Sequence, residues 1–554
     1  MENVLIASLG DSPIVVTAMY DLLIRQEDLE INKVVALHPY GYISLAFDYI
    51  KEVLNGRCEV ISEPLPFEDA NSKEDSFAFL HTLYRLLNDS QKNDDAVYLS
   101  LAGGRKNMSA LMALLVPLFP CVKGLYHVID KDENSSHSYH FKSIEEIIDL
   151  SDDDRLSYFS FDDDQLKRLN LIKIPYGKQQ QVSEGLRSLL FTITEEELGD
   201  LWDKDPQQAE MIETYRRITQ KPTSAPVLQI RLTERVKDEY ERMRRQNQFR
   251  ARRFTACFEQ MNNPYRLKDK IHGSGFNRGS LSFHFYKRND TAERPFYHTE
   301  PQGIHFFPKA KVETVIISGL AIEQDNGSYE PTGDELLQEF DPAEATVPLE
   351  AILPAGASTE STSMEESALI VPLGNTPMIA TQLYTLLTYV SDIRKVILVY
   401  PANSQEIKNG ADLLEKAFED EGKGVSCIRK VVPGHADIDT KEACLDYEKT
   451  LEEAIDAVCK YYQVELALSG GRKGMAALAM FVAQRKGIRY VYHTLITDKL
   501  LRDKVEKETT IDELRLTKVS KQVRNNRLFL REYEGNGPYT KFVLFKVPVL
   551  PARG

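Results

Sequence analysis

A four-residue run of two glycines and two cations occurs twice in the chain, at Gly103–Lys106 and at Gly470–Lys473. In each copy an apolar segment precedes the run and a helix-forming segment follows it. This order predicts a strand, a glycine turn and the first turn of a helix. Such a turn directs backbone N–H groups and the positive end of a helix dipole at one point, beside two cationic side chains. The sequence therefore predicts two anion-binding turns, suited to a symmetric, phosphate-rich ligand.

The duplication extends well beyond these turns. An apolar segment that ends in a glycine turn opens each copy, at residues 4–13 and 368–377. Further apolar segments recur in the same order, at 34–37 and 396–399, at 124–129 and 489–494, and at 171–175 and 544–548. Self-similarity over several hundred residues indicates duplicated domains. Strands that alternate with helices predict an α/β fold with doubly wound, mostly parallel sheets, in which ligands bind at the carboxyl ends of the strands.

The net charge of the 554-residue chain is −16, but its distribution is uneven. Residues 228–311 contain 18 Lys and Arg against 9 Asp and Glu, a net of +9, so the rest of the chain carries −25. A basic segment within an acidic chain is typical of a module that faces nucleic acid. Residues 323–366 contain twelve Asp and Glu and no Lys or Arg. Their composition predicts a flexible acidic linker.

The remaining composition excludes several classes of protein. None of the six cysteines forms a C-x-x-C pair, so neither a zinc site nor a disulfide scaffold is expected, and we expect no metal and no cofactor. The N-terminal residues have no signal-peptide pattern, and no apolar run reaches the length of a membrane span. We therefore expect a cytoplasmic protein with no membrane partner.

Within the basic segment, the pattern predicts a strand, two helices and an antiparallel meander. If Leu281, Phe283 and Phe285 face the core, period-two alternation places alternate residues on the opposite face. With the next strand added, this face would gather five candidates for general acid–base and phosphate chemistry, because histidine titrates near neutral pH and arginine binds phosphate bidentately. These catalytic candidates are His284, Tyr286, Arg288, Arg294 and His298. Candidates for positioning RNA are Lys268, Lys270, His272 and Arg278.

The paired turns resemble the CARF family, the Rossmann-like sensors of type III CRISPR systems. The resemblance rests on residues 10–13 and 374–377 after the first strands, together with the two Gly-Gly-Arg-Lys turns, and it covers about 1–150 and 367–500. It implies that a cyclic oligoadenylate, with cyclic tetra-adenylate preferred, binds between two such domains. The alternative is a Rossmann pair for a mononucleotide, although neither first strand is followed by Gly-x-Gly-x-x-Gly. The residues that would hold the ligand are Gly10, Asp11, Ser12, Gly103, Gly104, Arg105 and Lys106 in the first copy, and Gly374, Asn375, Thr376, Gly470, Gly471, Arg472 and Lys473 in the second.

The basic segment resembles the RelE family of mRNA interferases over about 227–322. The resemblance rests on the sequence from Leu228 to Met243, on Phe258–Pro264 and on the strand Val312–Gly319. It implies an α+β ribonuclease domain with two helices on an antiparallel sheet. The family commonly continues its last strand with a basic pair, and Leu320 and Ala321 stand there instead. An alternative is the all-helical HEPN ribonuclease, whose Arg-x4–6-His spacing fits Arg266 and His272.

Together these patterns predict six segments. They are a sensor domain at 1–150, a connector that completes it at 151–226, a RelE-like domain at 227–322, the acidic linker at 323–366, a second sensor domain at 367–500 and an extension that packs on it at 501–554. The predicted function is a metal-independent ribonuclease, activated by a cyclic oligoadenylate, that acts on mRNA, with the ribosome as a candidate partner. The alternatives are a non-catalytic regulator that binds nucleic acid or the ribosome, and a sensor that cleaves its own ligand. The protein is expected to be a monomer with intramolecular sensor pairing or a homodimer.

Overall fold

The computed structural model describes most of the chain. The described residues are 2–10, 12–41, 45–68, 73–130, 142–176, 227–261, 271–288, 291–300, 312–349, 366–421, 424–533 and 541–549, with residues 201, 204, 209, 212, 267 and 352 between them.

The first copy forms a six-stranded sheet in the order β3-β2-β1-β4-β5-β6. Its strands are mostly continuous apolar runs, as expected of a parallel sheet buried on both faces by helices. The first five strands are parallel and β6 is antiparallel to β5. The elements are β1 (Asn3–Ser8), α1 (Val15–Gln26), β2 (Lys33–His38), α2 (Leu45–Val53), β3 (Glu59–Pro64), α3 (Lys73–Lys92), β4 (Ala96–Ser100), α4 (Lys106–Leu115), β5 (Val122–Asp130), α5 (Ile144–Ile148), α6 (Asp152–Phe159), α7 (Asp163–Arg168) and β6 (Leu169–Lys173).

The second copy repeats this topology in the order β16-β15-β14-β17-β18-β19, again with an antiparallel sixth strand. The predicted α/β class with largely parallel sheets is therefore confirmed. The elements are β14 (Glu366–Pro372), α15 (Met378–Leu387), β15 (Asp392–Pro401), α16 (Gln405–Glu421), β16 (Ser426–Val432), α17 (Lys441–Asp456), β17 (Gln463–Ala467), α18 (Lys473–Lys486), β18 (Tyr490–Ile496), α19 (Lys499–Glu508), α20 (Lys521–Leu528) and β19 (Phe542–Pro548).

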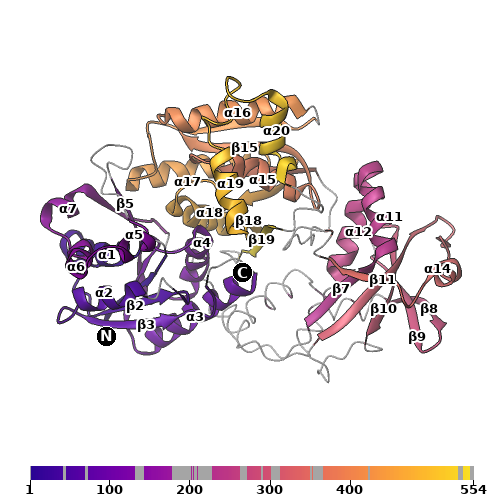
Figure 1. The fold of residues 1–554 in the computed structure, drawn as a ribbon, viewed down its shortest axis with the longest axis horizontal. Coiled ribbons are helices and arrows are strands. Elements are labelled where there is room, and N and C mark those ends of the chain that lie inside the picture. The colour runs from indigo at the N-terminus through magenta and orange to yellow at the C-terminus, as the bar shows by residue number, and fades with distance from the viewer. Residues whose placement is uncertain are drawn as a thin grey trace.

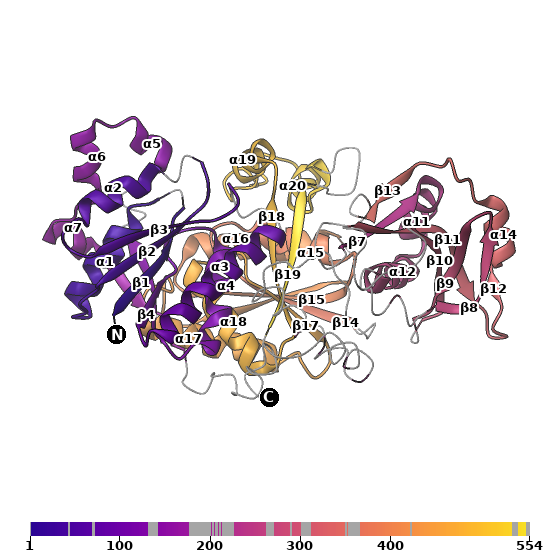
Figure 2. The same cartoon turned by 90° about the horizontal axis from the view of Figure 1, so that it is seen from below.

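The two copies share one hydrophobic core. Helices α4 and α18, each of which follows a Gly-Gly-Arg-Lys turn, pack on each other at the centre of the molecule (Figures 1 and 2). Leu111 of α4 and Ala477 of α18 belong to the same buried cluster. The rings of Tyr176 and Phe481 lie 5.9 Å apart across this interface. The repeated turns are therefore brought together within one chain.

The sequence between the two copies forms a separate α+β unit, which lies at the right of Figure 1. Its sheet has the order β13-β7-β11-β10-β9-β8, with β7 and β11 parallel and the other pairs antiparallel. The predicted order of strand, two helices and antiparallel meander is found, and the all-helical HEPN alternative is wrong because 271–323 contain strands. The elements are β7 (Val227–Thr233), α11 (Glu234–Gln246), α12 (Gln248–Met261), β8 (Ile271–Arg278), β9 (Leu281–Tyr286), β10 (Glu293–Glu300) and β11 (Val312–Glu323).

The acidic segment differs from the flexible linker that composition predicts. Its first half contains β12 (Tyr329–Glu330), α14 (Gly333–Glu339) and β13 (Thr346–Pro348), and β13 pairs with β7. The segment folds because Leu336 and Phe340 bury their side chains on the inserted sheet, against Phe283 and Phe296. These apolar contacts outweigh the acidic composition, and the carboxylates of Asp334, Glu335 and Glu339 stay exposed. The rest of the predicted linker lies largely outside the described residues.

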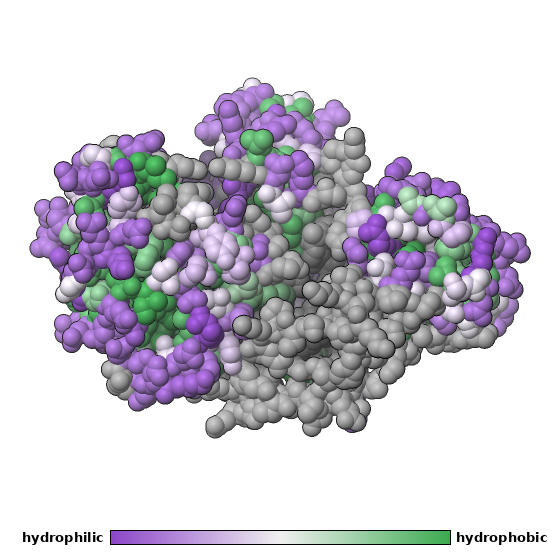
Figure 3. Space-filling view, turned by 60° about the horizontal axis from the view of Figure 1, so that its bottom comes forward, coloured by the Kyte–Doolittle hydropathy of each residue, from purple (hydrophilic) through white to green (hydrophobic). Residues whose placement is uncertain are grey.

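Hydrophilic side chains cover most of the described surface of the inserted unit on the face drawn in Figure 3. Within the described part of the chain, no helix combines the length and the apolar character needed to cross a bilayer.

Candidate ligand site at the paired glycine turns

Each glycine turn is fixed by close contact with the end of the first strand of its copy. A Cβ atom on Gly103 would lie 1.5 Å from the carbonyl oxygen of Ser8, and one on Gly10 would lie 2.7 Å from the backbone nitrogen of Gly104. In the second copy, a Cβ atom on Gly470 would lie 2.1 Å from the carbonyl oxygen of Pro372, and Gly470 has a φ of +117°. Only glycine fits these positions. The glycines therefore bring two loops and a helix N-terminus to one place in each copy.

The two turns also meet each other. The Lys473 Nζ donates a hydrogen bond of 2.5 Å to the backbone oxygen of Ala102, next to Gly103 of the first copy. A Cβ atom on Gly474 would lie 3.1 Å from Ile174 and 3.7 Å from the imidazole of His127. Residues separated by some 371 positions thus share one site. The structure brings together the glycine turns that the sequence assigned to a single ligand.

The predicted ligand residues lie around this point where the structure describes them. Arg105 and Arg472 are the N-cap residues of α4 and α18, in extended backbone conformation, so the first turn of each helix, whose N–H groups have no intrahelical acceptor, begins at the glycine turn. Gly10 and Ser12 lie between β1 and α1, and Gly374, Asn375 and Thr376 lie between β14 and α15. Asp11 lies outside the described residues, and the structure gives no side-chain position for Lys106.

The site also contains an acidic residue that no sequence motif indicated. Asp437, in the loop after β16, accepts hydrogen bonds of 3.1 and 2.8 Å from the Arg472 Nε and pairs with a terminal guanidinium nitrogen. The neighbouring Asp439 offers its carbonyl oxygen to Asn170 of the first copy. The loop therefore orients Arg472 and also contacts both copies. No motif marked Asp437, because its role depends on the fold rather than on a local pattern.

Two histidines, also missed, occupy equivalent positions on the strands beside the turns. His493 of β18 bonds through Nδ1 to the hydroxyl of Ser469, which also accepts a hydrogen bond of 3.2 Å from the Thr494 N–H. In the first copy, Ala102 stands in place of Ser469, and the buried Nδ1 of His127 has no hydrogen-bond partner in the described part of the chain. Burial, reinforced by the positive charges of Lys473 and Arg472, lowers the pKa of His127 to about 3. The Tyr-His pair in both repeated strands was the available signal.

The five catalytic candidates of the inserted unit do not share one sheet face. Tyr297 pairs with His284 and Phe296 with Phe285, so Phe296 lies on the phenylalanine face. Arg294 and His298 therefore lie on that face, under α14, while His284 and Tyr286 lie on the face toward α12. The prediction of a single face is wrong, because it counted the two strands separately without their register.

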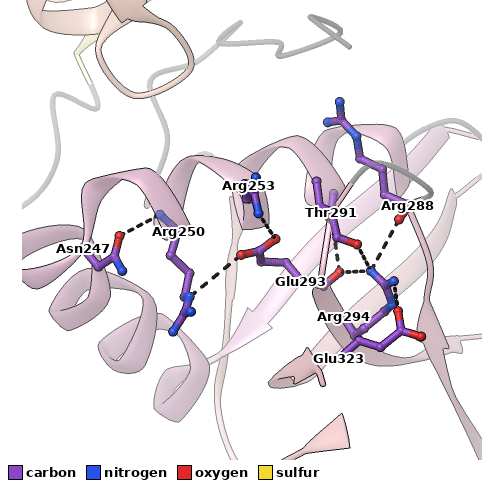
Figure 4. A network of polar contacts seen from close by, with 9 residues as sticks. Asn247, Arg250, Arg253, Arg288, Thr291, Glu293, Arg294 and Glu323 are labelled. Atoms are coloured by element: carbon purple, nitrogen blue, oxygen red, sulfur yellow. Dashed lines mark hydrogen bonds and ion pairs between the residues drawn. The ribbon is translucent and has the colours of Figure 1, made fainter. Parts of the chain in front are cut away.

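Burial further separates these candidates. Arg294, which is 2% exposed, donates hydrogen bonds of 2.6 and 2.8 Å to the carbonyl oxygens of Thr291 and Glu293 and pairs with Glu323 (Figure 4). His298 is 2% exposed, and burial lowers its pKa to about 4. Arg294 and His298 therefore make hydrogen bonds and packing contacts within the inserted unit. His284 is partly exposed, and burial lowers its pKa as well.

The candidates for RNA positioning are only partly described. Arg278 donates a hydrogen bond of 2.6 Å to the carbonyl oxygen of Leu337 and another to Phe340, so it caps the end of α14. His272 lies in β8, but its side chain is outside the described structure, as are Lys268 and Lys270. Arg250 and Arg253 instead form a basic pair on α12, 3.9 and 3.7 Å from the buried carboxylate of Glu293 (Figure 4).

The family comparison covers both copies and leaves out the inserted unit. Residues 12–197 and 376–553 match the family model described as CRISPR-associated protein NE0113 (Cas_NE0113). Among curated proteins, none matches the sequence.

Several solved structures are similar at low identity. A type III CRISPR defence DNA nuclease activated by cyclic oligoadenylate is 11% identical with a TM-score of 0.35, over 88% of this chain and 65% of that one. Csm6 of Enterococcus italicus, bound to cyclic hexa-2′-fluoro-hexa-dAMP, is 14% identical with a TM-score of 0.23, over 38% of this chain and 48% of that one. Protein VC1899 of Vibrio cholerae is 10% identical with a TM-score of 0.20, over 82% of this chain and 98% of that one. The chain thus spans less than two thirds of the first two structures.

Proposed function

The chain belongs to the CRISPR-associated protein NE0113 family, and on that premise we propose that it is a type III CRISPR effector that responds to a cyclic oligoadenylate. The two copies act as CARF sensor domains, and the paired glycine turns hold one ligand, preferably cyclic tetra-adenylate. The observation that carries this proposal is the contact of Lys473 with Ala102, which joins two equivalent anion-binding turns inside one chain. A ligand with repeated phosphates matches a site with repeated donors.

In this proposal the helix N-termini and the glycine-turn N–H groups donate to phosphate oxygens. Arg472, oriented by Asp437, adds a bidentate donor. Lys473 exchanges the Ala102 carbonyl for a phosphate oxygen, so ligand binding replaces a direct bond between the two copies.

Calorimetry with cyclic tetra-adenylate tests the site. The double variant Lys106→Ala with Lys473→Ala should bind more than about tenfold more weakly, since charge-assisted hydrogen bonds contribute roughly 1.5–3 kcal/mol each and tenfold is about 1.4 kcal/mol. The matched control is Lys123→Ala with Lys486→Ala, which removes two lysines that bond to Pro120 and Asp456 away from the turns. Equal affinity of both double variants would reject the site.

For the inserted unit, we propose a RelE-like ribonuclease that cuts RNA, with mRNA on the ribosome as the candidate substrate. Cleavage would use a 2′-hydroxyl as nucleophile and leave a 2′,3′-cyclic phosphate. His284 is the candidate base, because burial lowers its pKa and keeps the imidazole neutral and able to accept a proton at pH 7. Tyr286 ends the same strand and Arg288 follows it, and both residues are buried, so they would contribute to the site only if the fold opens there.

Activated cleavage of RNA, with and without ribosomes and cyclic tetra-adenylate, tests this activity. His284→Ala should lower the rate by roughly 10²-fold or more with unchanged folding. His298→Ala is the control, because His298 is packed between Phe283 and Phe340 and its loss should reduce thermal stability instead. Products with 5′-phosphates, or loss of cleavage on chelation, would contradict the proposed chemistry.

A second candidate function is a non-catalytic regulator that binds nucleic acid or the ribosome. The burial of Arg294 and His298 favours it, as does the fully buried Leu320–Ala321 pair where the RelE family places basic residues. Ligand-dependent binding of ribosomes or RNA without any cleavage would support this candidate over the nuclease.

A further inference from the structure

A cavity of about 370 Å³ lies between the helix hairpin of the inserted unit and the second copy. Helices α11 and α12 form one wall, and the C-terminal end of α15 forms the other. The two walls are joined by Arg252, whose Nε donates a hydrogen bond of 3.0 Å to the carbonyl oxygen of Thr388 and whose guanidinium lies 3.0 Å from Asp392. The cavity therefore lies at the junction of the two units, and its described lining contains no residue of the Gly-Gly-Arg-Lys turns. Its size falls within the usual range of ligand pockets, roughly 300–1,000 Å³.

The lining of this cavity is cationic. It includes four arginines, Arg244, Arg245, Arg252 and Arg531, and no Asp or Glu among the described lining residues. The carboxylates that hold these arginines stand outside the lining. Glu421 pairs with Arg531 at 3.0 Å and Glu241 pairs with Arg245 at 3.5 Å. Arg531 and Arg252 are thus positioned by carboxylates that do not themselves line the cavity.

The same lining offers aromatic surface and an unused hydroxyl. The Arg244 guanidinium lies 4.5 Å above the ring centre of Tyr389, and the Tyr384 ring packs edge-on against Phe418 and Phe529. The buried Oγ1 of Thr385 has no hydrogen-bond partner within the described structure. A buried polar atom without a partner is unfavourable in a folded protein and is commonly explained by a ligand or water. Arginines, tyrosine rings and a spare hydroxyl in one cavity match the parts of a nucleotide.

We propose that this cavity binds one nucleotide unit, with its phosphate on the arginines and its base against the tyrosines. The Thr385 hydroxyl hydrogen-bonds to the bound nucleotide. The nucleotide is supplied either as part of a single-stranded RNA, a source that rests on the proposed function, or as a free nucleoside monophosphate. Helix α15 begins next to the predicted ligand residues of the second copy and ends at this cavity. The cavity therefore lies one helix away from the proposed cyclic oligoadenylate site.

Fluorescence anisotropy of the full chain with a labelled 2′-O-methyl oligouridylate tests the proposal, because this probe has no 2′-hydroxyl and cannot be cut through it. Arg244→Gln should weaken binding by about tenfold, as expected for loss of a charge-assisted phosphate contact. Arg242→Gln is the matched control, since Arg242 lies on the same helix, is exposed and does not line the cavity. It should bind the probe as the unmodified chain does.

Thr385→Val provides a second variant that keeps the shape of the side chain. It should bind the probe several-fold more weakly while its thermal midpoint stays unchanged or rises, because a hydroxyl without a partner is removed. Equal loss in Arg244→Gln and Arg242→Gln, or unchanged binding in both Arg244→Gln and Thr385→Val, would overturn the proposal.

Competition by adenosine 5′-monophosphate distinguishes the two sources. Full displacement of the probe at similar concentration assigns the site to a free nucleotide, and absence of displacement assigns it to an RNA strand. Cyclic tetra-adenylate binding and RNA cleavage are measured in separate assays, so failure of the proposed function leaves this binding result intact.

Discussion

The clearest residue-scale difference between the two copies is Ala102 against Ser469. Ser469 gives His493 a hydrogen-bond partner, while Ala102 at the equivalent position has no hydroxyl, and the buried Nδ1 of His127 has no partner in the described part of the chain. An unmade hydrogen bond at a buried group costs roughly 1–3 kcal/mol. The first copy therefore keeps a destabilising feature beside the ligand turn, and the second does not.

Exchange of these two residues should change stability in opposite directions. Ala102→Ser should raise the thermal midpoint by a few degrees, through about 1 kcal/mol for the new bond to His127. Ser469→Ala should lower it, because His493 and the Thr494 N–H both lose a partner. Scanning calorimetry of both variants checks this. A fall in the midpoint of Ala102→Ser would show that the serine side chain does not fit.

The buried imidazole of His127 predicts an acid-sensitive fold. Its pKa is about 3 in the folded chain and near 6.5 in the unfolded chain, so the unfolded state binds the proton more strongly. The stability gained by keeping His127 neutral is present above pH 6.5 and is lost as pH falls, by up to about 1.4 kcal/mol per pH unit. Between pH 7 and pH 5, the free energy of unfolding of His127→Phe should fall by about 2 kcal/mol less than that of the unmodified chain. Denaturant unfolding at both pH values measures this difference. Parallel losses in both proteins would contradict the assignment.

At this scale the sequence predicted the meeting of the two glycine turns better than the sheet face of the candidate catalytic residues. The turns depend on local glycines and cations, and Lys473 and Arg472 indeed lie at the junction. The catalytic set depended on the register between β9 and β10, which the alternation within one strand does not define. Asp437 gave no local signal, because it acts through a contact with Arg472, which is distant in the sequence.

At the scale of elements, the strand–turn–helix unit depends on glycine geometry. Gly470→Ala places a Cβ about 2 Å from the Pro372 carbonyl oxygen at a strongly positive φ. The turn must therefore shift, and cyclic tetra-adenylate binding should weaken by more than about tenfold. Gly487→Ala is the matched control at the other end of α18, where φ is +65° and no atom lies within 4 Å. It should lose about 1 kcal/mol of stability or less and bind normally, as calorimetry can show.

Elements with a strong apolar period were predictable from sequence, because burial on both faces or on one face produces the pattern directly. The strands of both copies and the order of the inserted unit follow from it. Helix α14 was missed, since a short apolar group, Leu336, Leu337 and the C-cap residue Phe340, anchors this seven-residue helix in an acidic segment. Its stability comes from tertiary contact and from the Thr332 and Glu335 capping box rather than from composition.

For the whole molecule, the meeting of α4 and α18 predicts one cyclic oligoadenylate per chain. The two glycine turns meet within a single polypeptide, so in the proposed site we expect one chain to supply both halves. Calorimetric stoichiometry together with native mass measurement checks this. One ligand per two chains would show that the site forms between protomers instead.

The shared core of the two copies has a consequence for biosynthesis. The Ala102 turn leaves the ribosome 371 residues before Lys473, whose helix covers the apolar face of α4. At a translation rate of roughly 5–20 residues per second, the apolar face of α4 stays uncovered for on the order of 20–70 s until α18 has been synthesised. A nascent chain truncated before α18 should expose apolar surface and recruit chaperones, so complete translation becomes a condition for a soluble first half.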